Sequence, residues 1–189
     1  LKAAEQAGYS LNEDFNGKEQ QGFGLYQTTT RDGKRCSSAT AYLKPVRERK
    51  NLKVITKATA SRVVFENGKA TGLVYSVAGK GGFCEAASRE ILLCGGSINS
   101  PQLLMLSGIG PAAHLQEHGI PLVADSPGVG GNLQDHLQLR CAFKVKNAAT
   151  MNTRAASLIG KALIGLEYLV RRTGPMAMAP SQLGMFVKS

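Results

Sequence analysis

The stretch of sequence that decides the fold is ILLCGGSINSPQLLMLSGIG, residues 91–110. Its first part is an uninterrupted apolar run, and we predict that residues 90–94 form a buried strand of a parallel sheet. The pair Gly95-Gly96 follows directly. Ser100 and Pro101 then stand where a helix N-cap and a first helical residue are expected. Strand, glycine turn and helix in this order bring backbone N–H groups close to a nucleotide, although such a turn also occurs without a ligand.

Two helices are predicted on the carboxyl side of this turn. The first ends near Ser107-Gly108, because glycine readily takes the left-handed conformation that closes a helix. The second opens at Pro111 and stops at Gly119, with Pro121 just beyond it.

The residues before this stretch have the pattern of an antiparallel meander. A short apolar strand is predicted over residues 52–56. Residues 60–66 and 69–77 flank Asn67-Gly68, and this dipeptide between β-prone runs is the strongest short-range signal for a hairpin. A third strand is expected around residues 83–86. These elements indicate a mixed α/β fold, with an antiparallel hairpin beside a parallel strand.

The two outer stretches are less regular. Residues 1–50 are rich in Gly, Asn, Thr and Ser, and we expect loops there with a short helix near residues 38–43. Residues 137–145 are predicted to be extended, and residues 182–188 are expected to return as a strand.

A helix is predicted around residues 155–172, and Gly174-Pro175 ends it. Four leucines give this helix an apolar side: Leu158, Leu163, Leu166 and Leu169.

Composition indicates a globular protein. The chain has 189 residues, 43% of them hydrophobic, which is enough for one compact domain or two small halves. No apolar run reaches the roughly 18 residues of a transmembrane helix, so none is expected. The four cysteines are scattered and form no Cys-x-x-Cys pair, which argues against a zinc ribbon, a redox dithiol and a disulfide framework. Cys94 is expected to be a buried small hydrophobe. Cysteine usage thus predicts a reducing compartment, and we expect the cytoplasm.

The net charge of +10 raises the possibility of a nucleic-acid-binding module. The densest basic cluster lies within residues 44–53, and it contains no interleaved aromatic residues and no nucleic-acid motif. We therefore interpret it as a solvated face and expect no nucleic-acid partner.

Residues 96–110 resemble the second signature of the glucose–methanol–choline oxidoreductase family, with every constrained position of that pattern filled. The resemblance covers nearly the whole chain. The other segments that resemble family elements are Asp14-Phe15-Asn16-Gly17, Gly22-Phe23-Gly24, Arg35 to Leu43, Asn51-Leu52-Lys53-Val54 and Gly128 to His136.

This resemblance implies part of a flavin-binding Rossmann-like domain and part of a substrate-binding domain, woven from alternating parts of one chain. Residues 50–135 would belong to the FAD-binding domain, and residues 1–49 and 136–189 to the substrate-binding domain. The implied enzyme holds FAD and transfers a hydride from the CH–OH carbon of a small-molecule alcohol to the flavin. Oxygen, a quinone or another acceptor would reoxidise the flavin, and the sequence does not select among these acceptors.

The same resemblance assigns part of the adenine side of the flavin site. Ala60 matches the position whose backbone N–H and C=O pair with the adenine edge. Gly95, Gly96 and Ser97 match the turn near the adenosine end. Without the resemblance, Ala60 is simply a small inward-facing strand residue.

Two parts of the family pattern have no match in this chain. They are the Gly-x-Gly-x-x-Gly fingerprint that holds the pyrophosphate and the motif with the catalytic histidine. The residues from Leu1 to Gly8 also read as the end of a helix already under way. We therefore expect an internal fragment that has no catalytic residue and is inactive and colourless when isolated. The alternative is a non-catalytic truncated domain.

The substrate side of the resemblance turns on Gln138. Choline-oxidising relatives carry an acidic residue two positions after the His of Asp-His, where it can neutralise a quaternary ammonium. The neutral amide of Gln138 favours an uncharged alcohol over choline. His136 is either a structural histidine beside Asp135 or a contact near the flavin. His114 and His118 have metal-ligand spacing but no evident third ligand, so we predict an exposed pair and no metal site.

Overall fold

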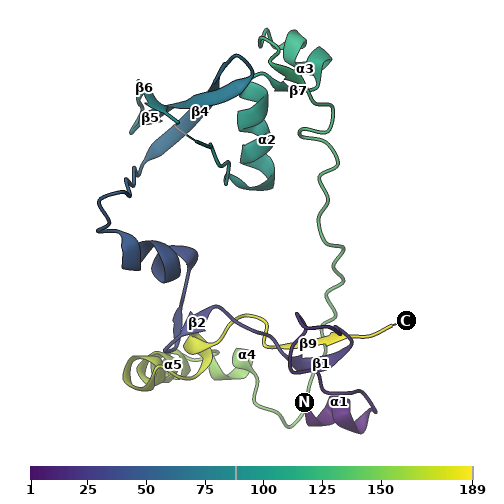
Figure 1. The fold of residues 1–189 in the computed structure, drawn as a ribbon. Helices are drawn as coiled ribbons and strands as arrows, with labels where there is room; N and C mark the ends of the chain where they lie inside the picture. Colours follow the sequence, from purple (N-terminus) through teal and green to yellow (C-terminus); the bar gives the residue numbers. More distant parts are fainter. Residues whose placement is uncertain (88, 189) are drawn as a thin grey trace. The chain divides into compact units, whose positions relative to one another are not determined.

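The computed structural model describes residues 1–87 and 89–188, and the chain divides into two units (Figure 1). The first unit combines residues 1–52 with the residues from Ala142 onward, and the second is Lys53–Cys141. The elements are of mixed α and β type, as the sequence predicts.

The second unit is built around a three-stranded antiparallel sheet in the order β4-β5-β6. Its strands are β4 (Ala58–Glu66), β5 (Lys69–Val77) and β6 (Lys80–Ala86). The predicted hairpin is confirmed, because β4 and β5 pair on either side of Asn67-Gly68. Asn67 has φ 51° and Gly68 has φ 77°, the positive values that a tight type I′ turn requires. The third strand is also confirmed and is longer than predicted.

Two predicted strands are wrong. Residues 52–56 and 90–94 form no strand, and Leu92 is 78% exposed. Cys94, expected to be buried, is exposed as well. A parallel strand exists only beside partner strands that supply its hydrogen bonds, and none of the described residues pairs with these segments. The apolar run indicates that residues 90–94 tend to be buried, but it does not identify the strands or helices that would cover them.

The helix after the glycine turn, α2 (Gly96–Leu106), begins five residues earlier than predicted and contains Pro101 in its interior. Ser100 is therefore not an N-cap. The helix ends as predicted, with Gly108 at φ 89°. Helix α3 (Ala112–Glu117) has Pro111 at its N-cap, and Gly119, which follows it, has φ 66°.

A short parallel pair completes the second unit. Strand β7 (Ile109–Gly110) pairs with β8 (Ala124–Asp125), and α3 lies between these two strands in the sequence. Leu115 of α3 is 1% exposed and forms the centre of this small cluster.

The first unit contains one small sheet and several short elements. Strands β1 (Gly22–Leu25) and β9 (Leu183–Phe186) pair antiparallel, which confirms the predicted return of the chain near residues 182–188. Phe15 packs its ring edge-on against Phe186 at 5.0 Å between centroids. The short elements are α1 (Lys2–Gln6), β2 (Thr30–Arg31), β3 (Lys34–Arg35), the helical turns η1 (Ala39–Leu43) and η2 (Lys44–Val46), α4 (Met151–Arg154) and η3 (Pro175–Ala177).

The long helix of this unit is α5 (Leu158–Arg171), which begins three residues later than predicted. The delay has a local cause, because Ser157 accepts a hydrogen bond from Gly160 N–H as the N-cap. Arg172 closes the helix in the left-handed conformation at φ 55°. The segment over residues 137–145 has no regular secondary structure and pairs with no described strand.

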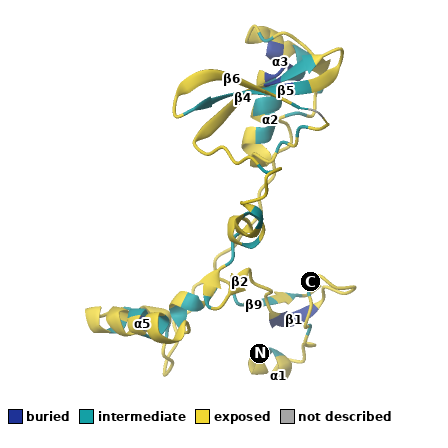
Figure 2. Ribbon diagram, turned by 60° about the vertical axis from the view of Figure 1, so that its left-hand side comes forward, coloured by how far each residue is buried: buried dark blue, intermediate teal, exposed yellow. Residues whose placement is uncertain are grey.

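The core is small in both units (Figure 2). Among the described residues, the buried hydrophobic side chains are Phe23, Val63, Leu115 and Ile164. Two separate compact domains with a combined mass of 20.0 kDa would expose about 10,500 Å². This chain exposes 16075 Å². Apolar surface that a compact domain would cover is therefore uncovered here, including the predicted apolar side of α5.

Candidate functional site

The cavity that contains predicted site residues lies in the second unit, between strand β4, helix α2 and the segment that precedes the helix. It has a volume of about 520 Å³. Ala58–Ala60 form one wall, Ile91–Gly95 form another, and the third comes from α2. The α2 residues that line it are Asn99, Ser100, Gln102, Leu103 and Leu106. The structure thus brings Ala60 and Gly95 to one cavity although they are far apart in the sequence.

Gly95 contributes to this cavity by lacking a side chain. A Cβ atom at Gly95 would lie 3.1 Å from Asn99 Cβ and 3.3 Å from the backbone nitrogen of Ser100. Its N–H donates a hydrogen bond of 3.0 Å to Ser100 Oγ. The amide is therefore already satisfied, and the glycine serves close packing of the turn on the helix.

The other two predicted site residues lie elsewhere on the turn. Gly96, with φ 86°, has open space where a Cβ would stand, and it does not line the cavity. Ser97 lines a second cavity of about 640 Å³, formed by α2 and residues 128–134. The structure thus places Gly95 and Ser97 at two different cavities near the start of α2.

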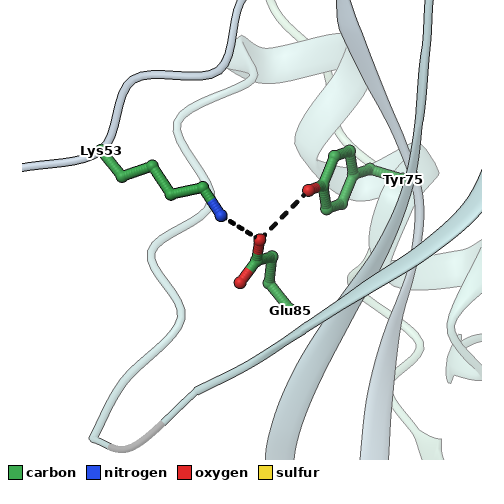
Figure 3. A network of polar contacts seen from close by, with 3 residues as sticks. All are labelled: Lys53, Tyr75 and Glu85. Carbon is green, nitrogen blue, oxygen red and sulfur yellow. Dashed lines mark hydrogen bonds and ion pairs between the residues drawn. The ribbon is translucent and has the colours of Figure 1, made fainter.

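An acidic residue on β6 links the sheet to the segment that leads into β4 (Figure 3). Lys53 Nζ donates a hydrogen bond to Glu85 Oε1, and Tyr75 donates one of 3.2 Å to the same oxygen. The hydrogen bond and charge of Lys53 hold the pKa of Glu85 below its usual value, and the same pair raises the pKa of Lys53. Desolvation, followed by the charge of Glu85, raises the pKa of Tyr75. This network connects the segment just before the cavity wall to β5 and β6.

Strand alternation could have suggested part of this network. Tyr75 pairs with Phe83 across β5 and β6, and Glu85 is two residues further on the same face. The sequence did not reveal Lys53 as a partner, because it lies 32 residues from Glu85.

The histidines lie outside the cavity. The rings of His114 and His118 meet edge-on at 4.8 Å between centroids, and both residues are exposed. Among the described residues, no group of three potential metal ligands gathers around them. Asp135 accepts a hydrogen bond of 2.8 Å from the backbone N–H of His136. This contact fixes the main chain and does not involve the imidazole.

None of the described helices is both long enough and apolar enough to cross a membrane.

Comparison with protein families and curated proteins gives consistent relatives. The family model described as "GMC oxidoreductase" matches residues 1–138. The whole chain is 45% identical to the oxygen-dependent choline dehydrogenase of Brucella ovis, of which it covers 34%. It is 47% identical to the mitochondrial choline dehydrogenase of Homo sapiens, of which it covers 32%. The chain thus spans about a third of the length of these relatives.

Solved structures also resemble the chain. A formate oxidase has a TM-score of 0.81 at 27% identity, with 96% of this chain and 31% of the other covered. An FAD-dependent oxidoreductase from Chaetomium thermophilum has a TM-score of 0.82 at 26% identity, with 96% and 32% covered.

Proposed function

The chain belongs to the GMC oxidoreductase family, and from this premise we propose that it is part of an FAD-dependent alcohol oxidoreductase. The family resemblance of residues 96–110 is confirmed by this membership. By the parent protein we mean the full-length polypeptide that contains this chain. The proposed reaction is transfer of a hydride from the CH–OH carbon of an alcohol to the flavin.

The observation that carries the proposal is the cavity between Ala60 and Gly95. Its volume of about 520 Å³ lies within the usual size of small-molecule sites. Strand β4 is an edge of its sheet, so part of its main chain faces away from β5 and is free to pair with a planar heterocycle. Glycine at position 95 lets the turn that forms the opposite wall pack closely on α2. These features fit the adenine half of FAD.

The bound cofactor would supply the hydride acceptor. The residues of this chain would hold it, with the main chain of Ala60 and the turn at Gly95, Gly96 and Ser97 on the adenosine side. We assign no proton-transfer residue within this chain. Residues 50–135 would form its flavin-binding part, and residues 1–49 and 136–189 its part of the substrate domain.

For the substrate we propose a neutral alcohol. The amide of Gln138 stands where choline-oxidising relatives carry an acid, and it offers an ammonium group no compensating charge. Choline is the second candidate, because the relatives with 45% and 47% identity are named choline dehydrogenases.

The parent protein should be purified and examined by absorption spectroscopy. We expect flavin bands at stoichiometric occupancy, and anaerobic addition of an uncharged primary or aromatic alcohol should bleach them. The methyl ether of the same alcohol is the control, because it has no hydroxyl proton to lose. A protein without flavin, or a flavin that no alcohol reduces, would overturn the proposal.

For the cell we propose a reducing compartment, because the four cysteines are scattered along the sequence and form no Cys-x-x-Cys pair. We propose the cytoplasm, and the name of the human relative makes mitochondria the alternative. Fractionation of the source cells would distinguish them. We propose no nucleic-acid partner.

A further inference from the structure

Ser107 joins the two elements that wall the cavity. Ser107 lies directly after α2. This polar residue is buried, at 7% exposure. Its Oγ accepts a hydrogen bond of 2.8 Å from the backbone N–H of Val63 in β4. Its hydroxyl donates one of 2.5 Å to the carbonyl oxygen of Leu103. A single side chain therefore connects the helix to the strand.

The position of this link along β4 is significant. The pairing of β4 with β5 shifts between Ala60 and Arg62, so an irregularity lies between the cavity residue Ala60 and Val63. An irregular edge strand is free to move on the side that has no partner strand. The bond from Val63 to Ser107 anchors the strand immediately after that point. Leu103, which also lines the cavity, is held by the same hydroxyl.

We propose that Ser107 is a positioning residue of the flavin site, which sets the spacing between Ala60 on β4 and Leu103 on α2. It touches no cofactor atom in this role. It acts by giving the buried N–H of Val63 its acceptor, because an unpaired buried N–H would draw β4 away from the helix toward water. The inference rests on the proposed function, since it concerns the cavity assigned to the adenine half of FAD.

The decisive comparison uses three variants of the parent protein and titration of the apoprotein with FAD, followed by flavin fluorescence. Ser107→Ala removes the acceptor, and Ser107→Thr keeps a hydroxyl in the same place. Ser61→Ala is the matched control, because the hydroxyl of Ser61 on β4 also donates a hydrogen bond of 3.0 Å to a backbone carbonyl, Val74 O on β5, but Ser61 is exposed. We expect Ser107→Ala to raise the Kd for FAD at least about fivefold, Ser107→Thr to restore most of the affinity, and Ser61→Ala to change it little.

A second measurement needs no variant. Coupling between two sites is reciprocal, so FAD must strengthen the link if the link strengthens FAD binding. Hydrogen exchange at the Val63 amide of the wild-type parent should therefore slow on addition of FAD. This result tests the inference even if Ser107→Ala does not fold.

The outcomes separate the inference from the proposed function. A wild-type parent that binds no FAD would refute both. A wild type that binds FAD, with unchanged affinity in Ser107→Ala or unchanged exchange at Val63, would refute the positioning role alone. Equal weakening in Ser107→Ala and Ser107→Thr would also refute it, because the hydroxyl would then not be the cause.

Discussion

The backbone N–H of Gly95 donates a hydrogen bond of 3.0 Å to the side-chain oxygen of Ser100, which fastens the glycine turn to the first turns of α2. The bond sets the start of the helix and the edge of the cavity together. It also leaves very little room on the glycine, since a Cβ would approach Asn99 to 3.1 Å. The first prediction follows from this crowding.

Gly95→Ala should lower the free energy of unfolding by about 1 kcal/mol, because the new methyl group pushes against the helix backbone, which cannot yield without losing hydrogen bonds. FAD affinity of the parent protein should fall as well, since the methyl group stands at the cavity wall. Thermal unfolding and FAD titration measure the two effects. Gly165→Ala in α5 is the control of opposite sign, because its Cβ meets nothing within 4 Å. It should stabilise the helix by about 0.5–1 kcal/mol. Equal effects at the two positions would contradict the packing argument.

The second prediction concerns the pH dependence of the network around Glu85. The hydrogen bond from Lys53 lowers the pKa of Glu85, so the stability it contributes is present above the unfolded pKa and is lost as the pH falls through the folded pKa. The pKa of Lys53 is raised, so its contribution is present below the unfolded pKa and is lost as the pH rises through the folded pKa. The ion pair between Lys53 and Glu85 thus contributes stability at pH values above the folded pKa of Glu85 and below the folded pKa of Lys53.

Lys53→Met should raise the pKa of Glu85 toward its ordinary value, and a ¹³C NMR titration of the glutamate carboxyls would measure the change. Lys80→Met is the control, because Lys80 lies on the same strand as Glu85 but forms no ion pair with it among the described contacts. Salt should weaken the effect in the wild type, since both partners are exposed. A Glu85 titration that does not respond to Lys53→Met would show that the ion pair does not persist in solution.

Local chemistry explains which elements could be predicted. A tight hairpin turn requires positive φ at both central residues, and Asn67 and Gly68 are residue types that adopt it readily. The hairpin could therefore be predicted from the dipeptide alone. Residues 90–94 were predicted from hydrophobicity, which does not specify a partner strand, and that strand was wrong. The start of α2 was misplaced because Ser100 bonds backwards to Gly95 and not forwards into the helix.

In the candidate site, too, local sequence patterns identify some residues but not the contacts between distant segments. Ala60 and Gly95 were identified through a resemblance that concerns a local pattern, and the structure brings them to one cavity. The bond between Val63 and Ser107 joins residues 44 positions apart, and no periodicity in either segment indicates it. Such contacts depend on how α2 packs on β4, which only the tertiary structure determines.

The third prediction concerns the exposed apolar side of α5. Leu163 is 59% exposed, whereas its neighbour Ile164 is 7% exposed. Leu163→Gln should change the free energy of unfolding of the chain by no more than about 0.5 kcal/mol. It should also reduce binding of a hydrophobic dye, because exposed apolar patches are the surfaces that such dyes and other chains bind. Ile164→Gln should instead lower the free energy of unfolding by about 2 kcal/mol or more. Chemical denaturation and dye fluorescence measure both, and a destabilising Leu163→Gln would mean that this side is covered in solution.

The last prediction concerns Gln138 and the choice of substrate in the parent protein. An ammonium head group must leave water to enter an apolar pocket, which costs several kcal/mol unless a carboxylate or an aromatic face compensates. Gln138 offers only a dipole, so neutral alcohols should have a higher kcat/KM than choline. Gln138→Glu places a negative charge at the same position and should narrow this difference by improving turnover of choline. Gln116→Glu is the control, because it adds the same charge at an exposed position of α3 that lines neither cavity, and it should leave the ratio nearly unchanged. The measurement is kcat/KM for choline and for an uncharged alcohol of similar size in all three proteins. A wild type that strongly prefers choline would show that an acidic group other than residue 138 neutralises the ammonium, and the relatives named choline dehydrogenases would then indicate the substrate directly.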